Sequence, residues 1–214
     1  MNCLKYGMSV LFVLLFIACN RQPKAENTGP EKQSVTTVRQ PAQPANTGSP
    51  YEPVDVSPMD MSYFPVHYPL EKLAGKMVAP PVMRVIYSRP HLQGRSLFNG
   101  ILKYNEPWRL GANEATELDV FKAVTLSGRK IAPGRYTLYV IPHEKNWTLV
   151  LSSNIDNWGL KQDPTKDLQR IEIAATTGNP RTEYFTMVFK QTGRGADLLM
   201  AWDDVLAVAP FVIN

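Results

Sequence analysis

The sequence predicts an all-β protein, a single antiparallel β-sandwich of the jelly-roll or immunoglobulin-like kind, preceded by a signal peptide and a disordered, proline-rich tether. Three observations predict the β domain over residues 81–214. Short runs of alternating apolar and polar residues recur, turn residues separate them at hairpin-scale spacing, and no helical period is long. Roughly seven to nine strands at this spacing are typical of a sandwich, with a barrel as the alternative.

Residues 1–18 have the features of a signal peptide. Lys5 precedes an apolar run that is too short to span a bilayer, because a spanning helix needs roughly 20 apolar residues. The sequence Phe16-Ile17-Ala18-Cys19 resembles a bacterial lipobox, in which cleavage precedes a cysteine that is then acylated. We therefore expect a lipoprotein with palmitate-type chains on Cys19. Phe16 departs from the usual Leu or Val, and a plain signal peptide or an uncleaved anchor is the alternative.

Acylation of Cys19 predicts the location of the protein. Two or more acyl chains anchor a protein stably, so the membrane is the expected partner of Cys19. Asn20 follows the cysteine, and a residue other than Asp at this position favours the outer membrane over retention at the inner membrane. We therefore expect a lipid-anchored protein of the periplasmic cell envelope. Cys3 is the other of the two cysteines, so the domain itself has no disulfide and no thiol nucleophile.

Residues 19–60 are expected to form the tether. Prolines recur among Gln, Thr, Asn and Ser, and no aromatic residue occurs from Asn20 to Pro50. Such a stretch cannot bury enough apolar surface to offset its ordering entropy. Residues 61–80 contain aromatic side chains, but their prolines exclude a central strand. We expect them to form an irregular segment that docks on the domain.

The strands expected in the domain follow one another in chain order. The first half contains predicted strands at residues 82–88, 118–125, 136–141 and 147–151. The second half contains predicted strands at residues 170–174, 184–190, 198–202 and 205–213. One short helical turn is expected at residues 164–169. Pro210, inside the last strand, predicts a sheet edge or a bulge, because proline cannot donate to a ladder.

Several motifs resemble one known family. They are Ser88-Arg89-Pro90, Gly94-Arg95, the block WRLGANEAT at residues 108–116, the turn IAPGRY at residues 131–136, and Trp147. Together they are similar to domain-of-unknown-function family 2911 of bacterial secreted proteins and lipoproteins, over residues 83–212. The block at 108–116 is the specific part, since a Pro-Gly-x-Tyr turn alone is common. The resemblance implies no activity, substrate or catalytic residue.

The block at residues 108–116 is also the densest set of functional groups. Gly111 and Asn113 tolerate positive φ, so a sharp turn could point Arg109 and Glu114 into one cavity. Arg109 would then bind a carboxylate or phosphate, while Asn113 and Glu114 bond hydroxyl groups. The alternative is a buried Arg109–Glu114 ion pair, with Asn113 and Thr116 satisfying backbone groups of the loop.

Neighbouring residues extend this candidate site. Arg89 and Arg95 could add positive charge at the same end of the domain, or Arg89 could cap strand carbonyls instead. The tryptophans offer faces for sugar rings, with core packing as their alternative fate, and Trp158 is the one expected to be exposed. The candidate binding residues are Arg89, Arg95, Trp108, Arg109, Asn113, Glu114 and Thr116.

Composition and motifs argue against several classes of function. The formal net charge of +4 is small and spread along the chain, so no nucleic-acid partner is expected. The three histidines show no zinc spacing and no Asp-rich calcium loop occurs, so we expect no metal and no cofactor. No Gly-x-Ser-x-Gly elbow, P-loop or dinucleotide fingerprint is present.

Three functions are compatible with these features. The first is an envelope lipoprotein whose domain binds a small molecule, a glycan or an envelope polymer. The second is a structural or interaction module whose partner is an envelope protein. The third is a hydrolase of envelope material, with Glu114 as the catalytic acid or base and Arg109 as an anion clamp. The sequence favours binding over catalysis.

Overall fold

The computed structural model describes residues 55–77 and 79–213, which lie within one compact unit, residues 41–214. The predicted signal peptide, Cys19 and most of the predicted tether lie outside the described residues. Within the described part, no helix is both long enough and apolar enough to cross a membrane. Strands dominate this part of the chain.

The elements follow in this order: β1 (Met59–Phe64), α1 (Tyr68–Leu73), β2 (Met83–Ser88), β3 (Thr116–Val120), β4 (Val124–Leu126), β5 (Arg129–Ile131), β6 (Gly134–Pro142), β7 (Asn146–Ser152), the 3₁₀ turn η1 (Pro164–Lys166), β8 (Asp167–Thr176), β9 (Thr182–Thr192), β10 (Gly195–Asp203) and β11 (Val205–Ile213).

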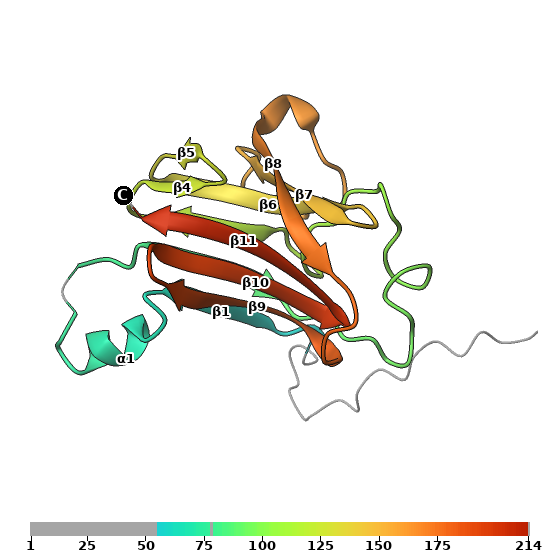
Figure 1. The fold of residues 1–214 in the computed structure, drawn as a ribbon, viewed down its shortest axis with the longest axis horizontal. Helices are drawn as coiled ribbons and strands as arrows, with labels where there is room; N and C mark the ends of the chain where they lie inside the picture. The colour runs from blue at the N-terminus through green and yellow to red at the C-terminus, as the bar shows by residue number, and fades with distance from the viewer. Residues whose placement is uncertain (1–54, 78, 214) are drawn as a thin grey trace, which may run out of the picture. The chain divides into compact units, whose positions relative to one another are not determined.

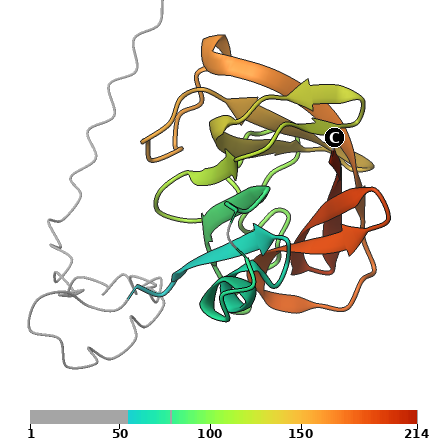
Figure 2. The ribbon, with the colours of Figure 1, turned by 90° about the vertical axis from the view of Figure 1, so that its left-hand side faces the viewer.

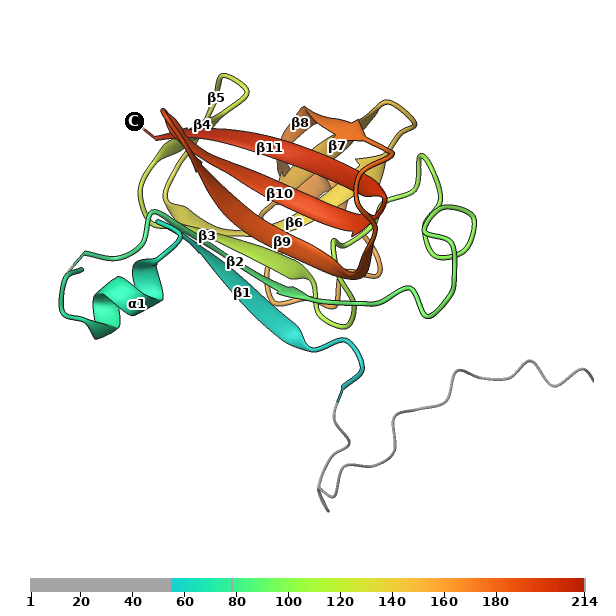
Figure 3. The ribbon, with the colours of Figure 1, turned by 60° about the horizontal axis from the view of Figure 1, so that its bottom comes forward.

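The strands form one antiparallel sheet. Its order is β1-β2-β3-β6-β7-β8-β11-β10-β9, with β4 paired to β11 and β5 paired to β4. The sheet curls until its two end strands, β1 and β9, run side by side (Figures 1 and 3). The predicted all-β, antiparallel class is therefore confirmed. The two-sheet sandwich is not confirmed, because a single sheet curls into a nearly closed, barrel-like arrangement.

The core fills the inside of the curled sheet. Successive residues of a strand point to opposite faces, so alternate residues face inward. Leu118 and Val120 of β3, and Leu198 and Met200 of β10, are buried in this way. Figure 2 shows how the strands surround this interior. Packing of the inward side chains is therefore the main stabilising contribution in a domain without cysteines.

The line where β1 meets β9, here called the seam, is bridged by Arg89 at the end of β2. Its Nη1 donates to Asp60 Oδ2 of β1 at 3.2 Å. Its Nε donates to the carbonyl oxygen of Phe185 at 3.2 Å and its Nη2 to Thr186 Oγ1 at 2.9 Å, both on β9. One side chain thus joins both end strands of the sheet.

Residues 61–80 contain more regular structure than expected. β1 begins inside the expected tether, and α1 lies within the segment expected to be irregular. Pro65 follows the last residue of β1, and Pro69 occupies the first turn of α1, where a backbone N–H has no helical partner. Pro65 therefore flanks β1, Pro69 is tolerated in the first turn of α1, and neither proline interrupts its element.

The expected strand at 118–125 is broken into β3 and β4. A continuous strand would place Lys122 on the inward face that Leu118 and Val120 define, and burying an unpaired ammonium group is costly. The chain leaves the strand at residues 121–123, where Lys122 is exposed, and β4 pairs with β11 instead.

Two smaller expectations also need correction. The helical turn expected at 164–169 is limited to Pro164–Lys166, because residues from Asp167 onward pair with β7 as part of β8. Pro210 lies in an inner strand, neither at an edge nor at a bulge. It falls between residues 206–208 of β11, which pair with β8, and residues 211–213, which pair with β4. This gap accommodates a residue that cannot donate.

Replacing Arg89 by Ala should weaken the seam, because three hydrogen bonds to β1 and β9 are lost. We expect the free energy of unfolding in urea to fall by about 1–3 kcal/mol. Arg194→Ala is the control, since the exposed Arg194 side chain bonds to none of the described residues. It should change the free energy by no more than about 0.5 kcal/mol. Equal losses in the two variants would contradict the role of Arg89.

Candidate functional site

Nearly all the predicted binding residues lie on the connection between β2 and β3, residues 89–115, here called the β2–β3 loop. A connection of this length between neighbouring strands is unusual and commonly functional. Leu92, Leu97 and Leu102 anchor it, each at most 5% exposed. Trp108 also exchanges two backbone hydrogen bonds with Val140 of β6: Trp108 N donates to Val140 O at 2.8 Å, and Val140 N donates to Trp108 O at 2.9 Å. The loop is thus fixed on the barrel at several points.

The sharp turn in this loop uses residues other than the expected glycine. Leu110 and Asn113 have φ of 56° and 57°, whereas Gly111 does not have positive φ. Gly111 is needed for a close approach, because an added Cβ would lie 3.2 Å from Ser88 O and 3.3 Å from Thr116 Oγ1. Thr116 Oγ1 donates to the carbonyl of Leu110 at 2.6 Å and is fully buried. Thr116 therefore fixes the turn from inside.

The β2–β3 loop lines a cavity of about 400 Å³, here called the arginine cavity. Three of the predicted binding residues, Arg95, Trp108 and Arg109, line it together. Trp202 of β10 and Leu160 also line it. The cavity thus combines two guanidinium groups with aromatic surface.

Neither arginine of this cavity has a carboxylate partner among the described residues. Arg109 makes one long hydrogen bond, from Nη1 to the carbonyl oxygen of Trp158 at 3.4 Å. Arg95 donates from Nε and Nη2 to the carbonyl oxygens of Leu92 and His91, at 2.9 and 3.0 Å, which orients its guanidinium. Burial lowers the pKa of Arg109, and the charge of Glu114 acts in the opposite direction. A partly dehydrated guanidinium with free donors, such as that of Arg109, favours binding of an anion.

Two tryptophan rings, those of Trp108 and Trp202, supply apolar surface to the arginine cavity. Trp108 stacks on Trp202 with ring centroids 5.4 Å apart, and Phe185 meets Trp108 edge-on at 4.8 Å. Both indole N–H groups already donate to protein carbonyls, that of Trp108 to Gly111 and that of Trp202 to Glu183. A ligand would therefore contact ring surface here and not the polar edge of the indoles.

Glu114 lines a different cavity, of about 350 Å³, here called the Trp158 cavity. Its other polar lining residues are Glu117, Arg135, Asp156 and Asn157. Arg109 and Glu114 form no ion pair within 4 Å, and the structure does not bring them into one cavity. The expected constellation is therefore divided between two sites.

The other predicted residues make structural contacts. Arg89 bridges the seam, Thr116 fixes the turn, and the Asn113 amide donates to the carboxylate of Asp55. As expected, Trp158 is exposed, at 52%, whereas Trp202 is buried. The sequence does not distinguish Trp202 from the other tryptophans as a cavity residue, because only the curling of the sheet brings β10 to the loop. Among the described residues, no three His, Cys, Asp or Glu side chains gather as a metal site would require.

Comparison with known proteins gives a family and no function. The model of a family described as "Protein of unknown function (DUF2911)" matches residues 69–211, which include the whole β2–β3 loop, Trp158 and Trp202. No curated protein and no solved structure matches the chain.

Thr116→Val should destabilise the domain, because it leaves the buried carbonyl of Leu110 without its hydroxyl donor. We expect a loss of about 1–3 kcal/mol in the free energy of unfolding, measured in urea. Thr116→Ser keeps the hydroxyl and should lose clearly less. If Ser and Val variants were equally destabilised, the methyl group of Thr116 and not its hydrogen bond would be what matters.

Proposed function

Because this chain belongs to the DUF2911 family, whose description assigns no activity, we propose a function from the geometry alone: the β domain binds a small anionic molecule in the arginine cavity. One observation carries the proposal. The guanidinium of Arg109 is partly buried in a cavity wall, yet no carboxylate among the described residues pairs with it. A carboxylate or phosphate group of a ligand would provide the missing partner.

The rest of the cavity supports a ligand with two chemically different ends. Arg95, oriented by its bonds to the carbonyl oxygens of Leu92 and His91, offers a second guanidinium in the same cavity. Trp108, Trp202 and Leu160 would contact an apolar or ring-shaped remainder. The volume of about 400 Å³ lies within the range of small-molecule sites.

We further propose that the domain is held in the cell envelope as a lipoprotein, acylated at Cys19 and sorted to the outer membrane. The lipobox-like sequence ending at Cys19 and the Asn at position 20 support this. The site would then sample small molecules of the envelope while the lipid keeps the protein in place.

The geometry of the two cavities fits a binding function better than a hydrolase function. A hydrolase using Glu114 as acid or base and Arg109 as anion clamp requires both groups at one substrate. They line separate cavities, so this arrangement is not favoured. An envelope protein as the partner would be the better account if no small anion bound.

Arg109→Gln should weaken anion binding strongly while the fold persists. In the full chain, phenyl phosphate and benzoate should raise the melting temperature more than inorganic phosphate does, because they also fill the aromatic part of the cavity. Isothermal titration should show binding of phenyl phosphate weakened at least about tenfold by Arg109→Gln, or about 1.4 kcal/mol, and unchanged by Arg194→Gln. If Arg109→Gln instead lowers stability by several kcal/mol without altering phenyl phosphate binding, Arg109 is structural and the proposal fails.

Cys19→Ser should release the protein from the membrane. With acylation blocked, the chain should incorporate no radiolabelled palmitate and should move from the membrane fraction to the soluble fraction. Cys3→Ser is the matched control, since Cys3 lies within the predicted signal peptide, and it should leave both labelling and fractionation unchanged. Label retained in Cys19→Ser would contradict lipidation at this residue.

A further inference from the structure

We propose that the Trp158 cavity is a second binding site, specific for a sugar ring without an acidic group. The proposal is independent of anion binding in the arginine cavity. It is based on an exposed tryptophan on a fixed loop, on the cavity beside it, and on the polar groups at the cavity rim.

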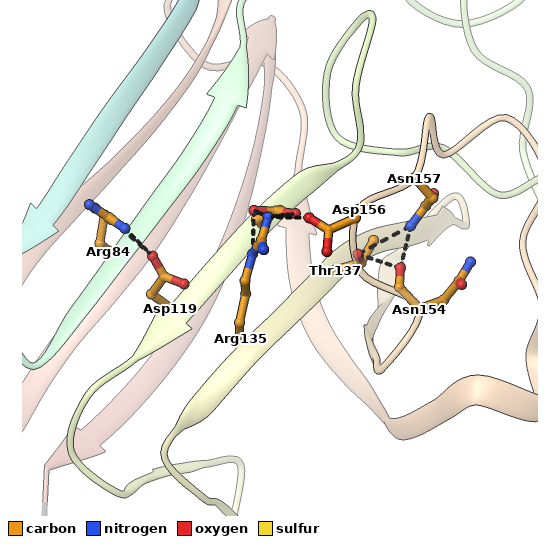
Figure 4. A network of polar contacts seen from close by, with 8 residues as sticks. Arg84, Asp119, Arg135, Thr137, Asn154, Asp156 and Asn157 are labelled. Carbon is orange, nitrogen blue, oxygen red and sulfur yellow. Dashed lines mark hydrogen bonds and ion pairs between the residues drawn. The ribbon is translucent and has the colours of Figure 1, made fainter.

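The backbone that carries Trp158 is held by several hydrogen bonds. Ala115 N donates to the carbonyl oxygen of Asn157 at 3.1 Å, and Gly159 N donates to Asn157 Oδ1 at 2.7 Å. The amide of Asn157 donates in turn to the carbonyl of Asn154 and to Thr137 Oγ1 (Figure 4). Bonds on both sides of residue 158 therefore fix its position.

The Trp158 indole contributes little to this local structure, because 52% of its surface is exposed. This indole also lines the Trp158 cavity, and aromatic side chains that line a cavity beside polar groups are typical of ligand sites. Because the backbone beneath the indole is already fixed, a ligand that stacks on the ring does not have to order the loop. A flat aromatic face of this kind suits the apolar face of a sugar ring.

The cavity beside Trp158 has the size and the mixed lining that a sugar requires. Its volume is about 350 Å³, and Met59, Ile86 and Ala115 supply apolar surface. Polar groups lie among them, which matches a ligand that has both apolar faces and hydroxyl groups.

The polar groups of this cavity are arranged to accept hydrogen bonds. Arg135 donates to both oxygens of Glu117, at 2.8 and 2.7 Å, and pairs with Asp156 at 2.8 Å (Figure 4). These contacts hold two carboxylates in fixed positions. Glu114 is exposed and bonds to none of the described residues, so its oxygens can accept from ligand hydroxyls.

The charge of the rim selects among sugars. Three carboxylates face the cavity with one guanidinium, so the local charge is negative. A sugar acid would be repelled, whereas a neutral or amino-bearing ring would not. The arginine cavity has the opposite preference, so the two sites should be separable by ligand charge.

The test measures binding of three oligosaccharides to the full chain by isothermal titration. The probes are the trimers of N-acetylglucosamine, glucosamine and galacturonate. We expect the first two to bind and the galacturonate trimer to bind at least tenfold more weakly, if at all. Binding of none of the three would overturn the proposal, as would equal binding of all three.

Variants then locate the site. Trp158→Ala should weaken binding of the N-acetylglucosamine trimer at least tenfold, and Trp158→Tyr should weaken it less because an aromatic face is kept. Leu168→Ala is the matched control, since Leu168 on β8 is 53% exposed and lies outside both cavities, and it should have no effect.

The two proposals fail separately. Phenyl phosphate binding should be unchanged in Trp158→Ala, because Trp158 does not line the arginine cavity and the hydrogen bond from Arg109 goes to its backbone oxygen. Loss of trimer binding in Arg109→Gln but not in Trp158→Ala would place the sugar in the arginine cavity and overturn this proposal.

Discussion

Closure of the sheet at the seam is the constraint on which the rest of the structure depends. The edge of a strand presents unpaired backbone groups that readily pair with other chains. Here β1 and β9 shield one another through side chains: Ser62 Oγ accepts from Phe189 N at 3.2 Å, and Phe64 packs on Phe189 with ring centroids 6.3 Å apart. Arg89 adds its three hydrogen bonds. Because the β2–β3 loop departs at Arg89, the residue that bridges the seam also sets where the loop leaves the sheet.

The curled sheet explains which parts of the fold the sequence could predict. β11 occupies the residues predicted for it, 205–213, because its alternation is long and uninterrupted. β1 was missed because its residues follow a proline-rich stretch, and its stability comes from pairing with β2, which is remote in sequence. The break between β3 and β4 had a local signal in Lys122, whereas the pairing of β4 with β11 had none.

The candidate site likewise has features that the sequence predicts and features that it does not. Arg95, Trp108 and Arg109 lie in one loop, so their convergence on one cavity was predictable from sequence. Trp202 enters the same cavity from β10, and nothing near it in sequence indicates this. The sequence also gives no sign that Arg109 and Glu114 line different cavities. Their separation depends on the left-handed backbone of Leu110 and on the segment around Gly159, after β7, which packs between Arg109 and Ala115.

That segment borders both cavities, since Gly159 lines the arginine cavity and Asn157 and Trp158 line the Trp158 cavity. Gly159 has φ of 71°, and an added Cβ would lie 3.0 Å from Arg109 Cβ and 3.1 Å from Ala115 Cβ. Across this segment the charge of Glu114 still favours the charged form of Arg109, against the effect of burial. A direct ion pair would do the same but would occupy the guanidinium donors. The charge of Glu114 therefore opposes part of the effect of burial on Arg109, and the separation of the two side chains leaves the N–H groups of Arg109 free for a ligand.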